Sequence, residues 1–164
     1  MAKKTFIFIL ALLFIQESYG QSQEKVYSVL LLKLARGIQW PNESQKESFV
    51  IGVLSYTPLA DELRSAVGSI KKGKHTITVR EFISTTETIN CDILFIPSFK
   101  SKTLPSVLGS LENNSTLIVT NKMDMTKMGS CINLMLENGK LRFEINASSI
   151  EKRGMKISTE VKNM

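Results

Sequence analysis

The sequence has little of the chemistry that most catalytic and metal sites need. It contains two cysteines, one tryptophan and a single histidine, His75. One histidine and two cysteines without ligand spacing do not predict a zinc site. No Gly-x-Ser-x-Gly motif is present, so nothing patterned supports a hydrolase built around His75. We therefore predict a protein that is not an enzyme and that uses no cofactor and no metal.

The sequence also lacks a concentrated basic patch. The formal net charge is +6, and the densest cluster is Lys71, Lys72 and Lys74. No aromatic side chains alternate with these lysines, as a nucleic-acid platform would require. We expect no nucleic-acid binding, and at most a weak attraction to an acidic partner or an anionic surface.

Long apolar runs are absent except at the N-terminus. A short basic start leads into an uncharged run over residues 5–15, and the small residues Ser18 and Gly20 stand before a predicted cut ahead of Gln21. This is the layout of a secretory signal peptide. A run of about eleven residues is too short to span a hydrocarbon core of about 30 Å. We expect residues 1–20 to be a cleavable signal peptide and the mature chain to be exported.

The sequence has only two cysteines, although an exported protein is expected to work in a compartment where disulfides persist. Cys91 and Cys131 each open a predicted buried strand. A bond between them would close a loop of about forty residues and contribute roughly 3–4 kcal/mol in the chain-entropy interpretation. Two buried thiols that behave as small hydrophobic side chains are the alternative. The sequence leaves both interpretations open.

The remaining chain, 21–164, alternates between helical and strand periodicity without repeats or low-complexity segments, which predicts one domain. Helices are predicted over 24–39 and 57–67, over about ten residues after Pro97, and from Ala147; strands are predicted over 49–54, 74–82, 91–96, 116–120, 131–136 and 140–146. This order predicts an α/β fold, with a mostly parallel sheet of five to six strands and helices on both faces. Asn138-Gly139 predicts a C-terminal antiparallel hairpin, and Thr57 is the expected N-cap of its helix, with Pro58 at the first helical position.

The last predicted strand carries a polar row. Arg142, Glu144 and Asn146 share one face, and apolar residues occupy the other. One interpretation is an edge strand with one wet face, where Arg142 and Glu144 form a same-face pair worth under about 1 kcal/mol. The other is that the row lines a cleft or contact surface, with Arg142 free to bind a carboxylate.

Arg36 and Trp40 form a second candidate site at the end of the first helix. Tryptophan is enriched at contact hot spots. A single tryptophan at a helix end also commonly seals the core, and the sequence does not decide between these roles.

Several segments together resemble one family of exported bacterial proteins. They are Ile38-Gln-Trp-Pro41, Phe49-Val-Ile-Gly-Val-Leu54, Cys91-Asp-Ile-Leu-Phe-Ile96, Gly129-Ser-Cys-Ile-Asn133, Leu141-Arg-Phe-Glu-Ile-Asn146 and Gly154-Met-Lys-Ile-Ser158. In this order, over nearly the whole mature chain, they resemble the YfiR-like family.

The resemblance implies a periplasmic α/β domain, often a homodimer, that regulates an inner-membrane signalling partner. In the best-known members that partner is a diguanylate cyclase, whose release raises cyclic di-GMP and promotes biofilm; some relatives accompany a sensor histidine kinase. The best-known member has two disulfides, whereas this chain has two cysteines. The resemblance also suggests a small aromatic ligand, which we place at Arg142. We therefore expect a non-enzymatic regulator of a membrane protein, with a periplasmic small-molecule-binding module as the alternative.

Overall fold

The computed structural model describes residues 22–41, 43, 46–68 and 70–163. The predicted signal peptide, 1–20, lies outside the described residues. Within the described part of the chain, no helix combines the length and apolar character that a membrane crossing requires.

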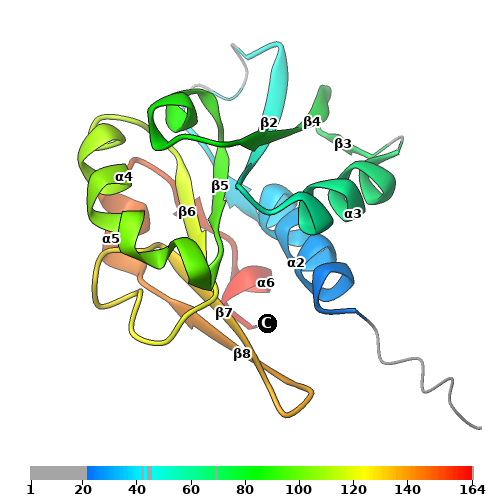
Figure 1. The fold of residues 1–164 in the computed structure, drawn as a ribbon. Coiled ribbons are helices and arrows are strands. Elements are labelled where there is room, and N and C mark those ends of the chain that lie inside the picture. Colours follow the sequence, from blue (N-terminus) through cyan, green and yellow to red (C-terminus); the bar gives the residue numbers. More distant parts are fainter. Residues whose placement is uncertain (1–21, 42, 44–45, 69, 164) are drawn as a thin grey trace, which may run out of the picture.

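The fold is built on a seven-stranded sheet with the order β3-β4-β2-β5-β6-β7-β8 (Figure 1). Its five central strands are parallel, and both edge strands run antiparallel to their neighbours. The strands are β2 (Ser48–Leu54), β3 (Lys71–Lys72), β4 (His75–Phe82), β5 (Ile93–Ile96), β6 (Leu117–Thr120), β7 (Ile132–Glu137) and β8 (Lys140–Ile145). The mostly parallel sheet is confirmed, with more strands than the sequence predicted.

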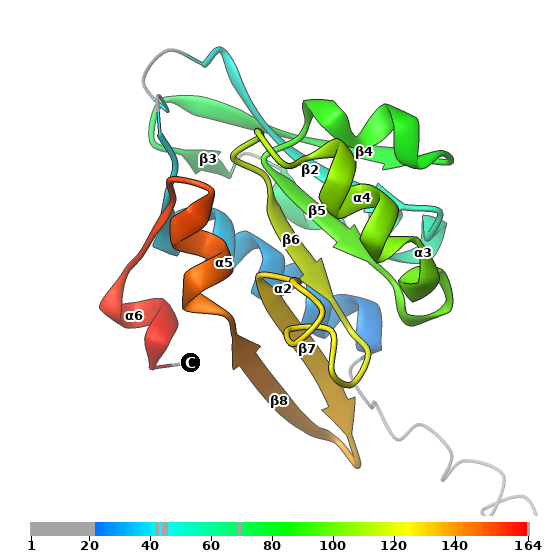
Figure 2. The ribbon, with the colours of Figure 1, turned by 90° about the vertical axis from the view of Figure 1, so that its left-hand side faces the viewer.

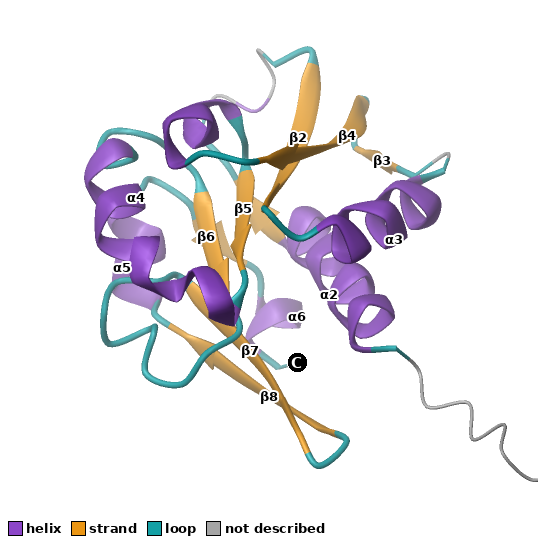
Figure 3. Cartoon of the chain, in the orientation of Figure 1, coloured by secondary structure: helices purple, strands orange, loops and turns teal. Residues whose placement is uncertain are grey.

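Helices cover both faces of the sheet, as predicted (Figures 1 and 3). On one face α2 packs against α3, and on the other lie α4 and α5, which Figure 2 shows in front of the sheet. The helices are α2 (Gln23–Gly37), α3 (Thr57–Val67), α4 (Leu104–Ser110), α5 (Ala147–Lys152) and α6 (Thr159–Lys162), with 3₁₀ turns η2 (Thr85–Asn90) and η3 (Ser98–Thr103). Because helices cover both faces, β5 and β6 are buried along their whole length, which explains their uninterrupted apolar sequences.

Some local structure differs from the predictions. Tyr56, not Thr57, is the N-cap of α3, and Pro58 therefore stands at the second helical position. The Thr57 hydroxyl instead donates to Glu81 Oε1 of β4 at 2.8 Å. The helix expected after Pro97 divides into η3 and α4. The short strands β1 (Ile38–Gln39) and β9 (Lys156–Ile157) pair with each other and carry no sequence signal long enough to predict.

The predicted hairpin joins β7 to β8. Asn138 and Gly139 have φ values of 52° and 72°, as a type I′ turn requires. β6 pairs with β7 only at Ile132 and Asn133. The rest of the hairpin therefore extends past the end of β6 and protrudes from the body of the domain (Figure 1).

The two cysteines are free, buried thiols, so the disulfide interpretation is wrong for this structure. Cys91 lies just before β5 and Cys131 just before β7, and β6 runs between those strands. Two strand spacings amount to about 10 Å, beyond the Cα separation of roughly 7 Å that a disulfide tolerates. Burial raises the pKa of both thiols, that of Cys91 to about 12.

Candidate functional site

The carboxyl ends of the parallel strands meet at one edge of the sheet. From β2 the chain continues into α3 on one face, and from β5 it continues into η3 and α4 on the opposite face (Figure 1). In doubly wound sheets, binding sites form where neighbouring strands send their connections to opposite sides. Here that point lies between the end of β2, followed by Tyr56, and the end of β5, followed by Phe99.

Tyr56 and Phe99 contact each other at this point. Their ring centroids are 5.7 Å apart, and the rings meet edge to face at 84°. The Tyr56 hydroxyl donates a hydrogen bond to the Glu24 carboxylate on α2. This bond lowers the pKa of Glu24, while burial, followed by the interaction with Glu24, raises the pKa of Tyr56 to about 12. The tyrosine is thus held neutral at the centre of the edge.

The end of β4 is held against the same region by Ser55. Its backbone N–H donates to the Phe82 carbonyl at 2.8 Å, and its hydroxyl to the Ile83 carbonyl at 3.2 Å. Ser55 has a φ of 49°, a left-handed conformation that is uncommon for a residue other than glycine. The turn therefore places Ile83 next to the loop that carries Tyr56.

Three large apolar side chains are exposed where β4, β5 and β6 end. Ile83 is 82% exposed, Phe99 62% and Met123 58%. Lys122, beside Met123, donates from Nζ to the Ser101 hydroxyl of η3 at 3.0 Å and so ties the last two loops together. We call Tyr56, Ile83, Phe99 and Met123 the carboxyl-edge surface.

This surface has the composition of a protein contact site. Exposed apolar groups that gather in one region mark interaction surfaces, and aromatic residues and methionine are enriched there. Lys100, Lys102 and Lys122 flank the surface on the η3 side. The arrangement suits a partner that presents apolar groups beside acidic ones.

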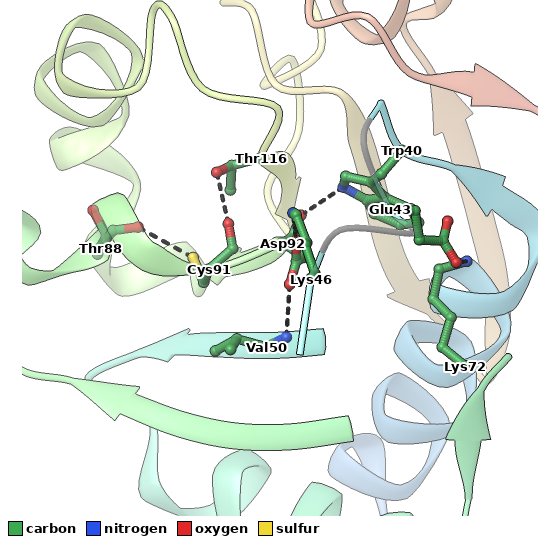
Figure 4. A network of polar contacts seen from close by, with 9 residues as sticks. All are labelled: Trp40, Glu43, Lys46, Val50, Lys72, Thr88, Cys91, Asp92 and Thr116. Carbon is green, nitrogen blue, oxygen red and sulfur yellow. Dashed lines mark hydrogen bonds and ion pairs between the residues drawn. The ribbon is translucent and has the colours of Figure 1, made fainter. Parts of the chain in front are cut away.

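The opposite edge of the sheet contains a buried polar network around Asp92, at the start of β5 (Figure 4). One carboxylate oxygen pairs with Lys46, and the other accepts the Val50 N–H at 2.7 Å. The Trp40 indole N–H donates to the Asp92 carbonyl at 3.2 Å. Each of these groups is satisfied inside the protein, so Asp92 serves to join the starts of β2 and β5 rather than to act as a free base.

A second lysine, which is buried, extends this network. The Lys72 ammonium donates to the Ile38 carbonyl at 3.0 Å, lies 3.4 Å from Glu43 Oε1, and stands 4.9 Å from the centre of the Trp40 ring. Trp40 itself meets Phe49 edge to face. Its role is therefore to seal the core and hold two lysine-bearing segments, which favours the core interpretation of this residue.

A groove of about 340 Å³ opens beside the network. Lys46, Ser48, Asn90, Asp92 and Thr116 are among the residues that line it. Small-molecule pockets are mainly apolar with few polar groups, and this lining is mainly polar. The groove is therefore a weak candidate for a drug-sized or aromatic ligand.

The structure does not gather the five predicted binding residues into one site. Arg36 is exposed in the last turn of α2, and Trp40 is buried at the amino edge of the sheet. Asn146 caps α5, where its side chain accepts the Ser149 N–H at 3.0 Å. Arg142 and Glu144 lie on β8, at the far side of the sheet from β4.

The predicted same-face pair between Arg142 and Glu144 is not formed. Arg142 instead lies 3.4 Å from Glu137 Oε2 on β7 and is 61% exposed. Glu144 Oε2 accepts from Thr126 and from Asn133, each at 3.2 Å. Arg142 and Glu144 each contact a residue of the neighbouring strand β7 instead of each other. The prediction of an ion pair within β8 was therefore wrong.

Sequence reasoning missed the residues of the carboxyl-edge surface and of the Asp92 network. An aromatic residue within three positions after each of two apolar strands was an available signal for Tyr56 and Phe99. An acidic residue at the start of an apolar strand was the signal for Asp92. In the described part of the chain, no group of three or more histidine, cysteine or acidic side chains is arranged to hold a metal ion.

Comparison with known families identifies the family of this chain. The sequence matches the YfiR/HmsC-like family over residues 24–164. The chain belongs to the YfiR/HmsC-like family. A comparison with curated proteins found no match.

The family match begins within α2 and covers every strand described above. The carboxyl-edge surface, the Asp92 network and the protruding hairpin are therefore all features of the YfiR/HmsC-like domain. The segments that suggested the resemblance lie in β1, β2, β5, β7, β8 and β9 or directly beside them, so they describe the framework of this domain rather than one site.

Proposed function

We propose that this protein is an exported, non-enzymatic regulator that binds the extracytoplasmic domain of a membrane signalling protein. The observation that carries this proposal is the match to the YfiR/HmsC-like family over residues 24–164. The expected partner is a diguanylate cyclase, with a sensor histidine kinase as the second type. In this proposal, binding and release of the partner change the level of cyclic di-GMP, or of phosphoryl transfer, inside the cell.

The carboxyl-edge surface supports a contact role. Tyr56 and Phe99 form a fixed aromatic pair, and Ile83 and Met123 extend the exposed apolar area to the neighbouring strand ends. Rigid aromatic side chains contribute strongly to binding because little conformational entropy is lost when they are covered. We infer that the partner covers these side chains and directs acidic groups toward the lysines of η3.

The small-molecule alternative has less support. Arg142, to which a carboxylate ligand was assigned, lies on the protruding hairpin and pairs with Glu137. The groove beside Asp92 is lined mainly by polar residues, and two of them, Asp92 and Thr116, already form hydrogen bonds within the protein. Neither arrangement resembles an apolar pocket with a few directed polar groups.

The test is recovery of the partner from the membranes of the organism that makes this protein. Full-length tagged protein would be produced in its own cells, and proteins that co-purify with it from solubilised membranes would be identified by mass spectrometry. We expect one cyclase or sensor kinase with an extracytoplasmic domain. Phe99→Ser and Ile83→Ser should each lower its recovery at least about tenfold, as loss of a hot-spot side chain does.

Val29→Ser provides the matched control, because Val29 is also exposed and apolar but lies on α2, outside the carboxyl-edge surface. Equal recovery with all three variants would show that the partner does not use this surface. If the folded wild-type protein recovers no membrane signalling protein, the regulator proposal fails. Cell fractionation with N-terminal sequencing tests export separately, with Gln21 as the expected first residue.

A further inference from the structure

The strand β8 forms an open edge of the sheet. It pairs with β7 along one side, and no pairing with another described strand is found on its other side. Figure 2 shows β8 as the outermost element at this edge. Lys140, Leu141 and Arg142 are exposed, and the rest of the strand is half-buried. An unpaired edge of this kind is a template for a further strand.

The backbone groups that face outward can be identified from the ladder with β7. The Asn146 N–H donates to the Cys131 carbonyl at 2.9 Å, in register with the pairs of the hairpin. In an antiparallel strand the N–H and C=O of successive residues point alternately to the two sides. Residues 140, 142, 144 and 146 therefore face β7, and Leu141, Phe143 and Ile145 present their N–H and C=O groups to the open edge.

We propose that β8 pairs antiparallel with β8 of a second copy of this protein, with Phe143 of one protomer opposite Phe143 of the other. In this register Leu141 stands opposite Ile145, and all of these residues present backbone groups that can form the ladder. Arg142 then stands opposite Glu144 of the other copy, and Glu144 opposite Arg142. The strand is thus complementary in charge to itself about a two-fold axis.

An axis at Ile145 would place Phe143 opposite Ala147, which belongs to α5 and cannot extend the ladder. The two-fold registers centred on Leu141, Arg142 or Glu144 are disfavoured by charge. An axis at Arg142 or at Glu144 places like charges directly opposite each other, which destabilises a strand pair. An axis at Leu141 places Arg142 opposite Lys140. The two Arg142–Glu144 pairs therefore select the register centred on Phe143, rather than merely permitting it.

The side chains have the capacity for these new contacts. Arg142 is 61% exposed and uses one guanidinium nitrogen for Glu137, which leaves further N–H donors. Glu144 accepts from Thr126 and Asn133 through Oε2, and a carboxylate can accept further bonds through its other oxygen. On the opposite face, Phe143 meets Phe143 and Leu141 meets Ile145 of the other copy as cross-strand apolar neighbours, which adds area to the contact.

The test uses charge reversal in the protein expressed from the full 164-residue sequence. Arg142→Glu places two carboxylates opposite each other across the two-fold axis, and Glu144→Arg places two guanidinium groups opposite each other. We expect the wild type to sediment as a dimer in analytical ultracentrifugation and each single variant to sediment as a monomer. An equimolar mixture of the two variants restores opposite-charge pairing across the axis and should sediment as a dimer. The double variant Arg142→Glu/Glu144→Arg should do the same.

Lys140→Glu is the matched control. It makes the same charge change on the same strand, but in this register residue 140 stands opposite the neutral Asn146, so the dimer should persist. Circular dichroism of every variant identifies any loss of folding, and the mixture identifies it independently, because an unfolded chain cannot restore the pair. Amide exchange at Phe143 should be at least about tenfold slower in the wild type than in Arg142→Glu.

A wild type that remains monomeric at high concentration overturns the proposal. So does a dimer that survives Arg142→Glu, since its interface must then lie elsewhere, and so does a mixture of the two single variants that stays monomeric. The residues substituted here lie on β8 and outside the carboxyl-edge surface. This experiment and the recovery of a membrane partner therefore succeed or fail independently.

Discussion

Removal of the Asp92 carboxylate should show what the buried network contributes to stability. In Asp92→Ala the Val50 N–H loses an acceptor at 2.7 Å, and both groups are buried. A hydrogen bond to a charged group contributes about 1.5–3 kcal/mol, and an unsatisfied buried donor retains its desolvation cost. The ion pair to Lys46 adds less than about 1 kcal/mol, because the lysine side chain is 37% exposed and regains water. We expect the free energy of unfolding to fall by about 2–4 kcal/mol.

Asp92→Asn separates the two contributions. The asparagine side-chain oxygen can still accept the Val50 N–H, whereas the charge that pairs with Lys46 is lost. We expect this variant to lose about 1 kcal/mol. Urea unfolding followed by circular dichroism measures both values, provided that the dependence on denaturant is the same in all variants. Equal losses for the two variants, or a loss below about 1 kcal/mol for Asp92→Ala, would refute the assignment of the stabilisation to the Val50 hydrogen bond.

Three further predictions concern other groups. The pKa of Glu24 is lowered from 4.5 chiefly by the Tyr56 hydroxyl, so its stabilisation is full above that pH and disappears as the pH falls through the folded pKa. Below pH 4.5 the free energy of unfolding should therefore change less with pH in Tyr56→Phe than in the wild type. An equal dependence on pH in the two proteins would contradict the contact. Burial of Cys91 and Cys131 predicts that a thiol reagent labels neither in the native protein and both after denaturation; rapid native labelling would contradict it. Gly52→Ala places a Cβ 2.5 Å from a ring carbon of the phenylalanine that ends β4, so thermal unfolding should show a loss of about 1–3 kcal/mol, and an unchanged melting temperature would show that the ring moves freely.

Local sequence patterns specified most of the elements. The apolar runs that became β5 and β6 are bounded by turn residues and are too short for helices, so their type was predictable. The hairpin was predictable because Asn138 and Gly139 tolerate the positive φ values of a type I′ turn. Signals of this kind act over a few residues, which is also why the two-residue strands and the N-cap at Tyr56 were not predicted.

The candidate site depended on contacts that no local pattern contains. Asp92 and Trp40 meet across 52 residues of sequence, and Lys72 reaches the Ile38 carbonyl across 34. The charges of Asp92 and Lys72 were visible in the sequence, but the residues that they contact were not. Arg142 and Glu144 show the same limit, because the hairpin partners on β7 replaced the neighbour that alternation alone suggested.

The sequence by itself determined an alternating α/β chain with a C-terminal hairpin and enough resemblance to assign the family that the comparison then confirmed. Only the tertiary structure decided that β2 lies between β4 and β5, which places Tyr56 beside Phe99 and exposes Ile83 near them. It also decided that β6 separates Cys91 from Cys131. The physical reason is that periodicity and turn chemistry fix each element locally, whereas strand order follows from how all the apolar faces are buried together.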